Sequence, residues 1–457
     1  MNSSISKNTN NRVPGADSGA HAGAPLPEIH VGADRCICPS SGAHADSGAY
    51  ADAPLQEIRV GADRCICPSN KPAIGHFSRT FFVKSETFIH HYLTHMKTVT
   101  PVCVSWNIEN ADLFPFPAEN MHALQLKPYS LQWFYYGTLK RLLHRDVYFR
   151  RIVEKQHLAL LHAHFGHNGV QALELKRGLK HDIPLVTTFY GADLSRRDIV
   201  EPMREDYLRL FQEGDLFLVE GPFMKTALQH IGCPAEKIEI QRIAVPVDRI
   251  AYRERKPDIR RPVQLVFCGR FIEKKGLIYA LEAVRKLWIE RKNRNFRFCI
   301  IGDGILKKDI VDFIDKHAMH DVVELPGFLT YDAYLNRLEQ ADVFIHPSVT
   351  AADGDSEGGA PTSILEAQAM GLPIISTVHA DIPHITVPGK SALLSPERDA
   401  DALAENILTL LENRDMGIEM GKAGRAFVET FHDVKKEVTK LEEKYLRLLH
   451  HGGSACL

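Results

Sequence analysis

The chain has 457 residues, of which 44% are hydrophobic and 25% are charged, and its formal net charge is -2. This length predicts two or three domains with substantial cores, and the composition excludes a wholly disordered or collagen-like chain. The near-neutral charge offers no global basic field for nucleic acid, and no apolar run is long enough for a membrane span or a secretion signal. We therefore expect a cytoplasmic protein whose nine cysteines are reduced thiols.

The first 70 residues contain an imperfect tandem repeat, in which residues 16–40 return almost unchanged as residues 45–69. The segment is poor in large apolar side chains, so it cannot bury enough surface to offset the entropy of ordering. We predict a disordered tail over residues 1–70. Each copy carries a Cys-Ile-Cys element, whose spacing is a poor match to structural zinc sites.

From Pro72 onward, short apolar runs alternate with amphipathic helical patterns, which predicts an α/β fold of βαβ units with buried parallel sheets. The charged segment 253–261 separates two series of similar size and is predicted to be a linker. We expect two doubly wound domains, 71–252 and 262–431, facing each other across a cleft, and a final helix over 432–450. The predicted strands are 99–104, 158–163, 185–188, 216–219, 264–268, 297–301, 322–325, 343–345 and 373–376, and the main predicted helices are 277–287, 306–316, 331–340 and 400–412.

Two glycine-flanked loops in the second half have features of ligand-binding loops. The first follows the strand that ends at Cys268 and places Arg270 and Lys275 between glycines, just before a helix. Cations at a helix N-terminus form an anion site, especially for phosphate, although a solvated charge run has the same sequence. The second loop, Gly302-Asp303-Gly304, lacks the third glycine and the acidic residue of a dinucleotide fingerprint.

A longer glycine-rich loop over 347–361 carries Glu357, and Glu366 lies one turn into the helix that follows. The free N–H groups at the start of that helix, near Thr362 and Ser363, favour an anion. Carboxylates beside such a site suit a ligand rich in hydroxyl groups. Ser363 and Glu366 also fit a capping box, in which Glu366 would only cap its helix.

These motifs occur in an order that resembles the retaining glycosyltransferases of family 4, and the resemblance covers residues 84–431. It implies the GT-B fold, which consists of two Rossmann-like domains with the C-terminal helix crossing back onto the first. The motifs that carry it are Gly269-Arg270 with Lys275-Gly276, Gly302-x-Gly304, Gly327-Phe328-Leu329, the run ADVFIHPS at 341–348, Glu357 with Glu366, and Gly371-Leu372-Pro373.

The resemblance implies a hexosyltransferase that moves sugar from a nucleoside diphosphate sugar to a hydroxyl acceptor, with retention at the anomeric carbon. The acceptor would be a polysaccharide or a lipid-linked glycan intermediate. In the family pattern, Arg270 and Lys275 match the diphosphate-binding cations, Glu357 the glutamate near the donor sugar, and Glu366 the one near the ribose. The donor-binding residues implied in this way are Arg270, Lys275, Gly302, Gly304, Glu357, Gly358, Gly359, Thr362, Ser363 and Glu366.

The chain departs from the family pattern between the two glutamates. Eight residues separate Glu357 from Glu366, whereas the family usually has one fewer. The additional residue falls in the segment 358–360, where glycine makes an insertion inexpensive. The partner of Glu357 therefore stays open at this point.

The first half contributes an acceptor side. Ser85, Glu86 and Thr87 match an S-E-T-F-I element of similar enzymes that make exopolysaccharides or lipid-linked glycans, although a helix-capping element would look the same. In a later loop, Tyr190 stands where the family often has histidine, while Asp193 is kept. We assign these five residues to the acceptor side.

Two histidines, His162 and His164, lie two residues apart at a strand end and therefore share a face. Together with His167 they suggest a metal site, but no carboxylate or cysteine accompanies them at ligand spacing, and buried core histidines fit equally well. The resemblance assigns His164 to the catalytic group with Glu357, Arg270 and Lys275, because a histidine at this strand end often approaches the donor sugar.

We expect no metal or other cofactor beyond the donor co-substrate. Arg270, Lys275 and the helix N-terminus near Ser363 can stabilise a departing diphosphate without a metal. The resemblance suggests that this phosphate helps to deprotonate the acceptor, so no dedicated general base is needed. Asp353-Gly354-Asp355 has the D-x-D spacing of metal-dependent glycosyltransferases, but such short matches are common in loops rich in Gly and Asp.

The segment 129–151 mixes aromatic with basic residues and predicts a helix on the surface of an anionic membrane, although an ordinary acceptor-domain helix would look similar. Peripheral attachment at the inner face of the membrane would suit a lipid-linked acceptor. The alternatives are a GT-B epimerase or phosphorylase, and a sugar-nucleotide binding protein without catalysis. A Rossmann dehydrogenase is disfavoured by the missing fingerprint.

Overall fold

The computed structural model describes residues 71–125, 130–143, 146–256, 258, 260–359 and 361–452. The predicted tail over residues 1–70, with its repeats and its Cys-Ile-Cys elements, lies outside the described residues. The cysteines among the described residues, Cys103, Cys233, Cys268 and Cys299, are free thiols.

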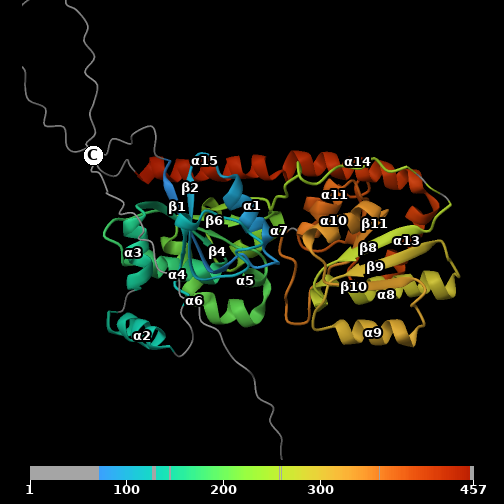
Figure 1. The fold of residues 1–457 in the computed structure, drawn as a ribbon, viewed down its shortest axis with the longest axis horizontal. Helices are drawn as coiled ribbons and strands as arrows, with labels where there is room; N and C mark the ends of the chain where they lie inside the picture. Colours follow the sequence, from blue (N-terminus) through green and yellow to red (C-terminus); the bar gives the residue numbers. More distant parts are fainter. Residues whose placement is uncertain are drawn as a thin grey trace, which may run out of the picture. The chain divides into compact units, whose positions relative to one another are not determined.

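Two parallel sheets organise the described chain (Figure 1). The first has the strand order β3-β2-β1-β4-β5-β6-β7, and the second has the order β10-β9-β8-β11-β12-β13. The strands of the first sheet are β1 (Ala73–Phe81), β2 (Thr100–Ile108), β3 (Met121–Ala123), β4 (Leu158–His164), β5 (Leu185–Thr188), β6 (Leu216–Val219) and β7 (Ile238–Ile240). Those of the second are β8 (Val263–Cys268), β9 (Phe296–Ile301), β10 (Val323–Gly327), β11 (Val343–His346), β12 (Ile374–Thr377) and β13 (Ala392–Ser395).

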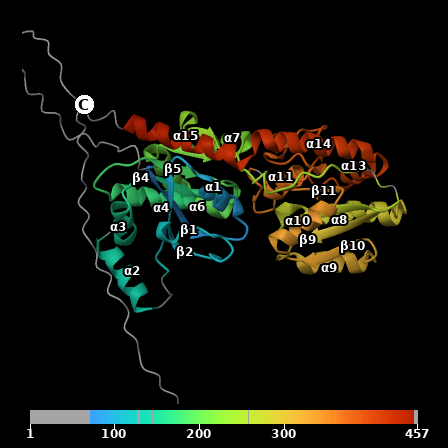
Figure 2. The same cartoon turned by 45° about the horizontal axis from the view of Figure 1, so that its top comes forward.

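Helices connect successive strands and cover the sheets, as βαβ crossovers require. Both views show them on the two faces of each sheet (Figure 2). They are α1 (Thr87–His95), α2 (Leu131–Leu143), α3 (Val147–Lys155), α4 (Gly166–Arg177), α5 (Ala192–Ser195), α6 (Arg197–Glu213), α7 (Pro222–His230), α8 (Leu277–Arg285), α9 (Lys307–Lys316), α10 (Tyr331–Gln340), α11 (Thr362–Ala369), α12 (Ile382–Ile385), α13 (Ala400–Glu412), α14 (Arg414–Phe431) and α15 (Val434–Gly452).

The predicted α/β class with two doubly wound sheets is confirmed. In each sheet the strand order reverses once, between β1 and β4 in the first and between β8 and β11 in the second. Strands such as β5 and β6 are buried along their whole length, which explains their continuous apolar sequences. In such sheets, ligands bind beyond the carboxyl ends of the strands at the point of reversal.

The central strand β1 was not predicted from the sequence. Its sequence, AIGHFSRTF, interrupts the apolar pattern with His76, Ser78, Arg79 and Thr80. His76 and Ser78 are nevertheless buried, because polar neighbours inside the domain replace water for His76 and the Thr80 carbonyl accepts from Ser78. Hydrogen bonding therefore outweighs the polar composition of this strand.

The predicted single helix over 129–151 is wrong in one respect, because two helices, α2 and α3, occupy this segment. The Asp146 side chain accepts a hydrogen bond from the Phe149 backbone at 3.2 Å and starts α3 as its N-cap. No described helix is long and apolar enough to cross a membrane.

The segment predicted as a charged linker is packed against the second sheet's domain. Arg255 donates hydrogen bonds to five backbone carbonyls, those of Arg253, Leu338, Ala341, Met370 and Gly371. Burial lowers the pKa of Arg255 to about 10, although the nearby Asp342 carboxylate opposes that change. The Arg255 charge therefore holds this segment against the protein and is not simply exposed to solvent.

The last helix, α15, lies against the first sheet. Its residues Val434, Val438, Leu441 and Tyr445 belong to one buried cluster with residues of the strands β1, β4, β5 and β6. The Glu442 side chain accepts hydrogen bonds from the backbone N–H groups of three consecutive residues, 97 to 99, just before β2. The C-terminal end of the described chain is thus part of the first domain's core.

Candidate functional site

The loops that follow β8 and β11 form the centre of the candidate site. Both strands end at the carboxyl edge of the second sheet, on either side of the point where its strand order reverses. The first loop contains Arg270 and the short 3-10 turn Glu273–Lys275, and the second contains Glu357. The sheet therefore brings together residues that are 82 positions apart in the chain.

Glu357 is held through both of its carboxylate oxygens. Its Oε2 lies 2.7 Å from the Lys275 Nζ, and its Oε1 accepts a hydrogen bond of 2.7 Å from the Ser348 hydroxyl. Burial opposes ionisation of Glu357, but the charges of Lys275 and Lys274 outweigh it and hold the pKa of Glu357 well below its ordinary value. The predicted residues Lys275 and Glu357 thus form a buried ion pair.

The neighbouring Lys274 binds the two residues of the same loop that precede Glu357. Its Nζ lies 2.9 Å from the Asp355 Oδ1 and donates to the Ser356 carbonyl at 2.8 Å. The other carboxylate of the D-x-D element, Asp353, accepts from the Asp355 backbone and lies 4.0 Å from Arg196. Asp355 is therefore paired with a lysine, and Asp353 accepts from a backbone donor and lies near an arginine.

Glycine is required where the loops approach each other. At Gly302, with φ of 141°, an added Cβ would lie 2.0 Å from the Gly269 carbonyl oxygen. At Gly358, with φ of 69°, it would lie 2.3 Å from the Gly191 Cα of the first domain. Side chains at these positions would separate the predicted diphosphate loops and the two domains.

Glu366 does not cap its helix, so the capping-box alternative is wrong. The helix α11 begins at Thr362 with Pro361 as N-cap, which puts Ser363 inside the first turn. The Glu366 Oε1 instead accepts a hydrogen bond of 3.1 Å from the Tyr331 hydroxyl. Burial raises the pKa of Glu366 to about 7, although the nearby hydroxyl groups of Tyr334 and Tyr331 oppose that rise.

Arg270 is exposed, and its charge acts on Lys275 and, from the other domain, on Glu86. Glu86 stands at the N-cap position of α1 without making a capping hydrogen bond through its side chain. Burial raises the pKa of Glu86 to about 7, the Arg270 charge opposes this rise, and the Glu109 charge adds to it. The pKa of Glu86, a residue of the first domain, thus depends on the charge of Arg270, the cation predicted to bind the diphosphate.

The glycine-rich loop of the second domain meets the first domain through backbone contacts. The Ser356 N–H donates to the Ser195 hydroxyl at 3.2 Å, and the Arg197 N–H donates to the Asp353 carbonyl at 3.4 Å. An added Cβ at Gly359 would clash with the Glu220 carboxylate. Loop residues on both sides of Glu357 therefore contact the first domain.

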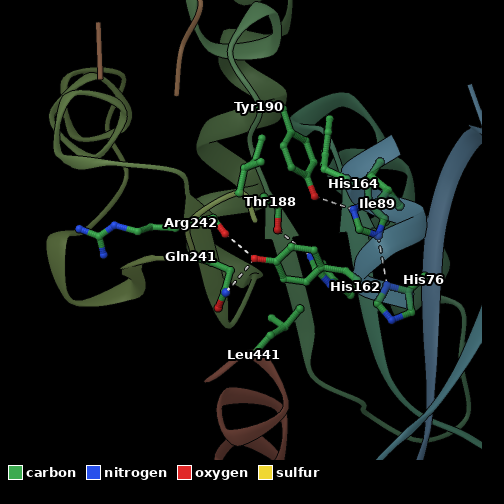
Figure 3. Close-up of a pocket in the computed structure, with 12 residues that line it drawn as sticks. His76, Ile89, His162, His164, Thr188, Tyr190, Gln241, Arg242 and Leu441 are labelled. Atoms are coloured by element: carbon green, nitrogen blue, oxygen red, sulfur yellow. Dashed lines mark hydrogen bonds between the residues drawn. The ribbon is translucent and has the colours of Figure 1, made fainter. Parts of the chain in front are cut away.

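A small cavity in the first domain contains the predicted His164 (Figure 3). The His164 Nε2 lies 3.1 Å from the His76 Nδ1, and its Nδ1 lies 2.7 Å from the Tyr190 hydroxyl. Burial lowers the pKa of His164 to about 3, so the imidazole is neutral. Both ring nitrogens of His164 are hydrogen-bonded within the protein, and only 3% of the residue is exposed.

The predicted pair His162 and His164 gathers with His76 rather than with His167. Among the described residues, these three form the group whose nitrogens lie near enough to suggest a metal, within 4.8 Å of one another. The nitrogens of His162 lie 2.6 Å from the Thr188 hydroxyl and 2.5 Å from the Tyr445 hydroxyl, so the histidines form part of a hydrogen-bonded network.

Asp193 organises the acceptor-side loop from inside. Its carboxylate accepts from the Gly166 N–H at 2.7 Å and from the Tyr190 N–H at 3.0 Å. Burial raises the pKa of Asp193 to about 6, although these backbone hydrogen bonds oppose the rise. Asp193 is only 1% exposed, and its carboxylate shapes the loop around Tyr190. Ser85, by contrast, is exposed and Thr87 is half-buried.

Several residues at the site were missed by sequence reasoning. Ser348 lies in a motif that the sequence already singled out, so its polar side chain after a strand end was an available signal. Lys274 belongs to the same glycine-flanked cation loop as Arg270 and Lys275, so its position was indicated by the sequence but its partners were not. Tyr331 and His379 gave no such signal, because their partners are distant in the chain. His76 was hidden by the failure to predict β1.

Two family models match this chain. The model described as Glycosyltransferase Family 4 matches residues 108–249, and the model described as Glycosyl transferases group 1 matches residues 248–427. The second match contains Arg270, Lys275, Glu357 and Glu366 together.

Two curated relatives are similar over much of their length. The chain is 37% identical over 281 residues to the colanic acid biosynthesis glycosyltransferase WcaL of Escherichia coli, covering 61% of this chain and 68% of the relative. It is 32% identical over 394 residues to the amylovoran biosynthesis glycosyltransferase AmsK of Erwinia amylovora, covering 78% of this chain and 94% of the relative.

Solved structures share the fold at low sequence identity. Alr3699/HepE of Anabaena, in complex with UDP, superposes with a TM-score of 0.66 at 15% identity, over 82% of this chain and 99% of that one. The sucrose-phosphate synthase of Thermosynechococcus elongatus superposes with a TM-score of 0.65 at 15% identity, over 83% of this chain and 100% of that one.

Proposed function

This chain belongs to the group 1 glycosyltransferases and has the GT-B fold, and from that premise we propose that it transfers a hexosyl unit from a nucleoside diphosphate sugar with retention at the anomeric carbon. The observation that carries the proposal is the buried pair of Lys275 and Glu357 beside Arg270, at the point where the strand order of the second sheet reverses. The pair joins a cation for a diphosphate to a carboxylate for sugar hydroxyls.

The proposed donor diphosphate binds between Arg270, Lys275 and the first turn of α11. Negative charge develops on the diphosphate as the sugar leaves, and fixed cations with free backbone N–H groups stabilise that charge without reorganising. The first N–H groups of α11, near Thr362 and Ser363, have no acceptor within their own helix. Gly302 and Gly304 let the backbone approach the nucleotide closely, as do Gly358 and Gly359 near the sugar.

No metal is part of the proposed mechanism. Asp353 and Asp355, which would be the ligands in the D-x-D reading, are engaged by Arg196 and Lys274. The positive charge that a metal would supply comes from the side chains named above. Transfer in the presence of a chelator is therefore expected.

The proposed step keeps the acceptor on the face from which the diphosphate departs. The bond from the anomeric carbon to the diphosphate oxygen breaks, and the bond from the acceptor oxygen to the same carbon forms. The acceptor proton passes to the departing diphosphate oxygen, so no separate base is required. In this proposal Glu357 contacts the sugar, Glu366 the ribose, and Glu86 the acceptor side, with Thr87 and Tyr190 nearby.

The proposed acceptor is a growing exopolysaccharide or its lipid-linked intermediate. The names of WcaL and AmsK assign those relatives to the synthesis of colanic acid and amylovoran. Another solved structure of Alr3699/HepE contains UDP-glucose, which favours a nucleotide sugar as donor here. His164 would contribute to catalysis only by shaping the cavity wall, because both of its ring nitrogens are hydrogen-bonded to protein groups.

We also propose that α2 contacts the inner face of an anionic membrane. Leu131, Phe134 and Tyr135 are 88%, 54% and 71% exposed on this helix, and Arg151 is exposed on the next one. Apolar side chains beside cations suit the interface of an anionic bilayer. The predicted cations Lys140 and Arg141 have side chains outside the described residues, as has the whole of Arg145.

A transfer assay tests the proposed function. The full chain would be incubated with UDP-, GDP-, dTDP- and ADP-sugars and with lipid-linked glycan acceptors, in the presence of EDTA. We expect release of a nucleoside diphosphate that depends on the acceptor, and a product whose anomeric configuration by NMR matches that of the donor. An inverted product would overturn retention. Donor binding without any transfer would support a binding protein, and donor turnover without an acceptor would support an epimerase.

A further inference from the structure

The backbone of the loop that carries Glu357 is held by a histidine from another strand end. The Glu357 N–H donates a hydrogen bond of 3.1 Å to the His379 Nε2. His379 follows β12, which pairs with β11 in parallel. The adjacency of these two strands therefore brings His379 under the loop that begins after β11.

A carboxylate from the third strand end orients this histidine. The His379 Nδ1 lies 2.6 Å from the Glu397 Oε1, and the His379 side chain is 1% exposed. An ionised carboxylate can only accept, so the proton of the imidazole is on Nδ1 and the lone pair is on Nε2. That lone pair is what the Glu357 N–H needs. The contact between His379 and Glu397 thus selects the tautomer that can hold the loop.

Glu397 is itself anchored near the start of the same loop. Its Oε2 accepts a hydrogen bond of 2.8 Å from the Thr350 N–H and lies 3.2 Å from the Arg398 guanidinium. Burial opposes ionisation of Glu397, but hydrogen bonds from Thr350 and His379 lower its pKa. Glu397 therefore connects the first part of the loop with the backbone at Glu357.

We propose that His379, oriented by Glu397, is a positioning residue for Glu357. This inference rests on the proposed function, in which the Glu357 carboxylate contacts the donor sugar. Lys275 and Ser348 fix the two carboxylate oxygens, and His379 fixes the backbone from which the side chain projects. Without this third contact, the loop shifts relative to the sugar while the cations for the diphosphate stay in place.

The first test compares two substitutions in the full chain. His379→Leu keeps the bulk of the side chain but removes the acceptor, whereas His379→Gln can place an amide oxygen near the position of Nε2. A displacement of about 1 Å can cost about 100-fold in rate. We expect His379→Leu to lower kcat by about 10- to 100-fold, with the Kd for the nucleoside diphosphate unchanged, and His379→Gln to recover most of kcat. A parallel loss of kcat and of diphosphate affinity, with no recovery by glutamine, would overturn the proposal.

A double-mutant cycle tests whether His379 acts through Glu357. In a Glu357→Gln background, His379→Leu should lower kcat little further, because coupled residues are not additive. Equal losses in both backgrounds would contradict the inference. If the wild-type chain transfers sugar and Glu357→Gln has wild-type activity, the assigned role of Glu357 in the proposed function fails.

Hydrogen exchange distinguishes a failure of the inference about His379 from a failure of the proposed function, because its measurement requires no enzymatic activity. Peptides spanning 351–359 should exchange their amide protons faster in His379→Leu than in the wild type or in His379→Gln, at an unchanged Tm. Unchanged exchange would overturn the inference, whatever reaction the protein catalyses. Faster exchange in a chain that transfers no sugar would leave the anchor standing and remove the proposed function.

Discussion

At the scale of single residues, the site is dominated by charges that are removed from water. The Lys275 and Glu357 side chains are 13% and 4% exposed, and each is the other's principal opposite charge. Burial lowers the pKa of Lys275, and the Glu357 charge opposes that change. Removing one partner leaves the other buried without compensation, which is more costly than removing both.

Lys275→Met should therefore affect both stability and activity. We expect a loss of about 3–5 kcal/mol in the free energy of unfolding, and a fall in kcat/KM of about 100-fold or more. The double variant Lys275→Met with Glu357→Gln should recover most of the stability in urea unfolding but none of the activity. Lys307→Met, which removes an exposed pair with Asp303, is the matched control and should change neither. Wild-type kcat/KM in Lys275→Met would refute the assignment of this cation.

Glu366 predicts a pH dependence of donor binding. Its pKa is raised to about 7, so the carboxyl is protonated below that pH and ionised above it. Only the ionised form accepts hydrogen bonds with both oxygens from ribose hydroxyls. The affinity of the wild type for a nucleotide sugar should rise as the pH increases from 6 to 8. The affinity of Glu366→Gln should be the same at both pH values. Calorimetry without acceptor measures this, and a parallel pH profile in both proteins would exclude the role.

At the scale of elements, the short apolar strands were the most predictable part. The strands β5 and β6 have the residues that the sequence indicated, because a continuous apolar run between polar turns fits a strand covered on both faces. The strand β1 was missed because its buried His76 and Ser78 look like loop residues until their partners are known.

The same distinction applies to the site. Arg270, Lys275 and Glu357 could be selected because glycine-rich loops after strands have a recognisable sequence. His379 and Glu397 could not, because their contact with the loop depends on β11, β12 and β13 lying side by side in that order. The capping box failed because the helix began at Thr362, before the serine that was expected to cap it.

The segment between the sheets supplies a test of stability. Arg255 donates hydrogen bonds to carbonyls at the ends of α10 and α11, namely those of Leu338, Met370 and Gly371. Arg255→Met should lower the free energy of unfolding by about 1–3 kcal/mol, since these acceptors lose a charged donor. Lys256→Met, at an exposed neighbouring position, should leave the urea midpoint unchanged. Equal midpoints for both variants would contradict the structural role.

The helix α2 supplies a test of membrane contact. A triple variant with Leu131→Ser, Phe134→Ser and Tyr135→Ser should co-sediment less with vesicles that contain phosphatidylglycerol. It has less apolar surface to bury in the membrane, and burial of such surface contributes about 25 cal/mol per Å² to the free energy of binding. The wild type should bind neutral phosphatidylcholine vesicles less well. Ile289→Ser, at a residue of the other domain that is 40% exposed, is the control. Equal binding of the triple variant and the wild type would exclude α2 as the contact.

At the scale of the whole described chain, two chain segments join the two domains, one near Val245 and one near His432. These two segments lie side by side. The Val245 N–H donates to the His432 carbonyl at 2.9 Å, and the Val434 N–H donates to the Val245 carbonyl at 3.1 Å. A second contact comes from Asp381, whose carboxylate accepts from the N–H groups of Phe223 and Met224 at the start of α7. Because Gly221 offers no capping side chain, the second domain supplies the cap of a helix in the first.

Calorimetry can show whether a nucleoside diphosphate binds the cations of the second domain without a metal. The full chain would be titrated with UDP, GDP, dTDP and ADP in EDTA, beside Arg270→Ala and the control Lys307→Met. We expect tight binding of one diphosphate by the wild type and the control. The affinity should fall about tenfold or more in Arg270→Ala, since a charge-assisted contact is worth about 1.5–3 kcal/mol. Binding that requires a divalent cation, or that is unchanged in Arg270→Ala, would contradict this expectation.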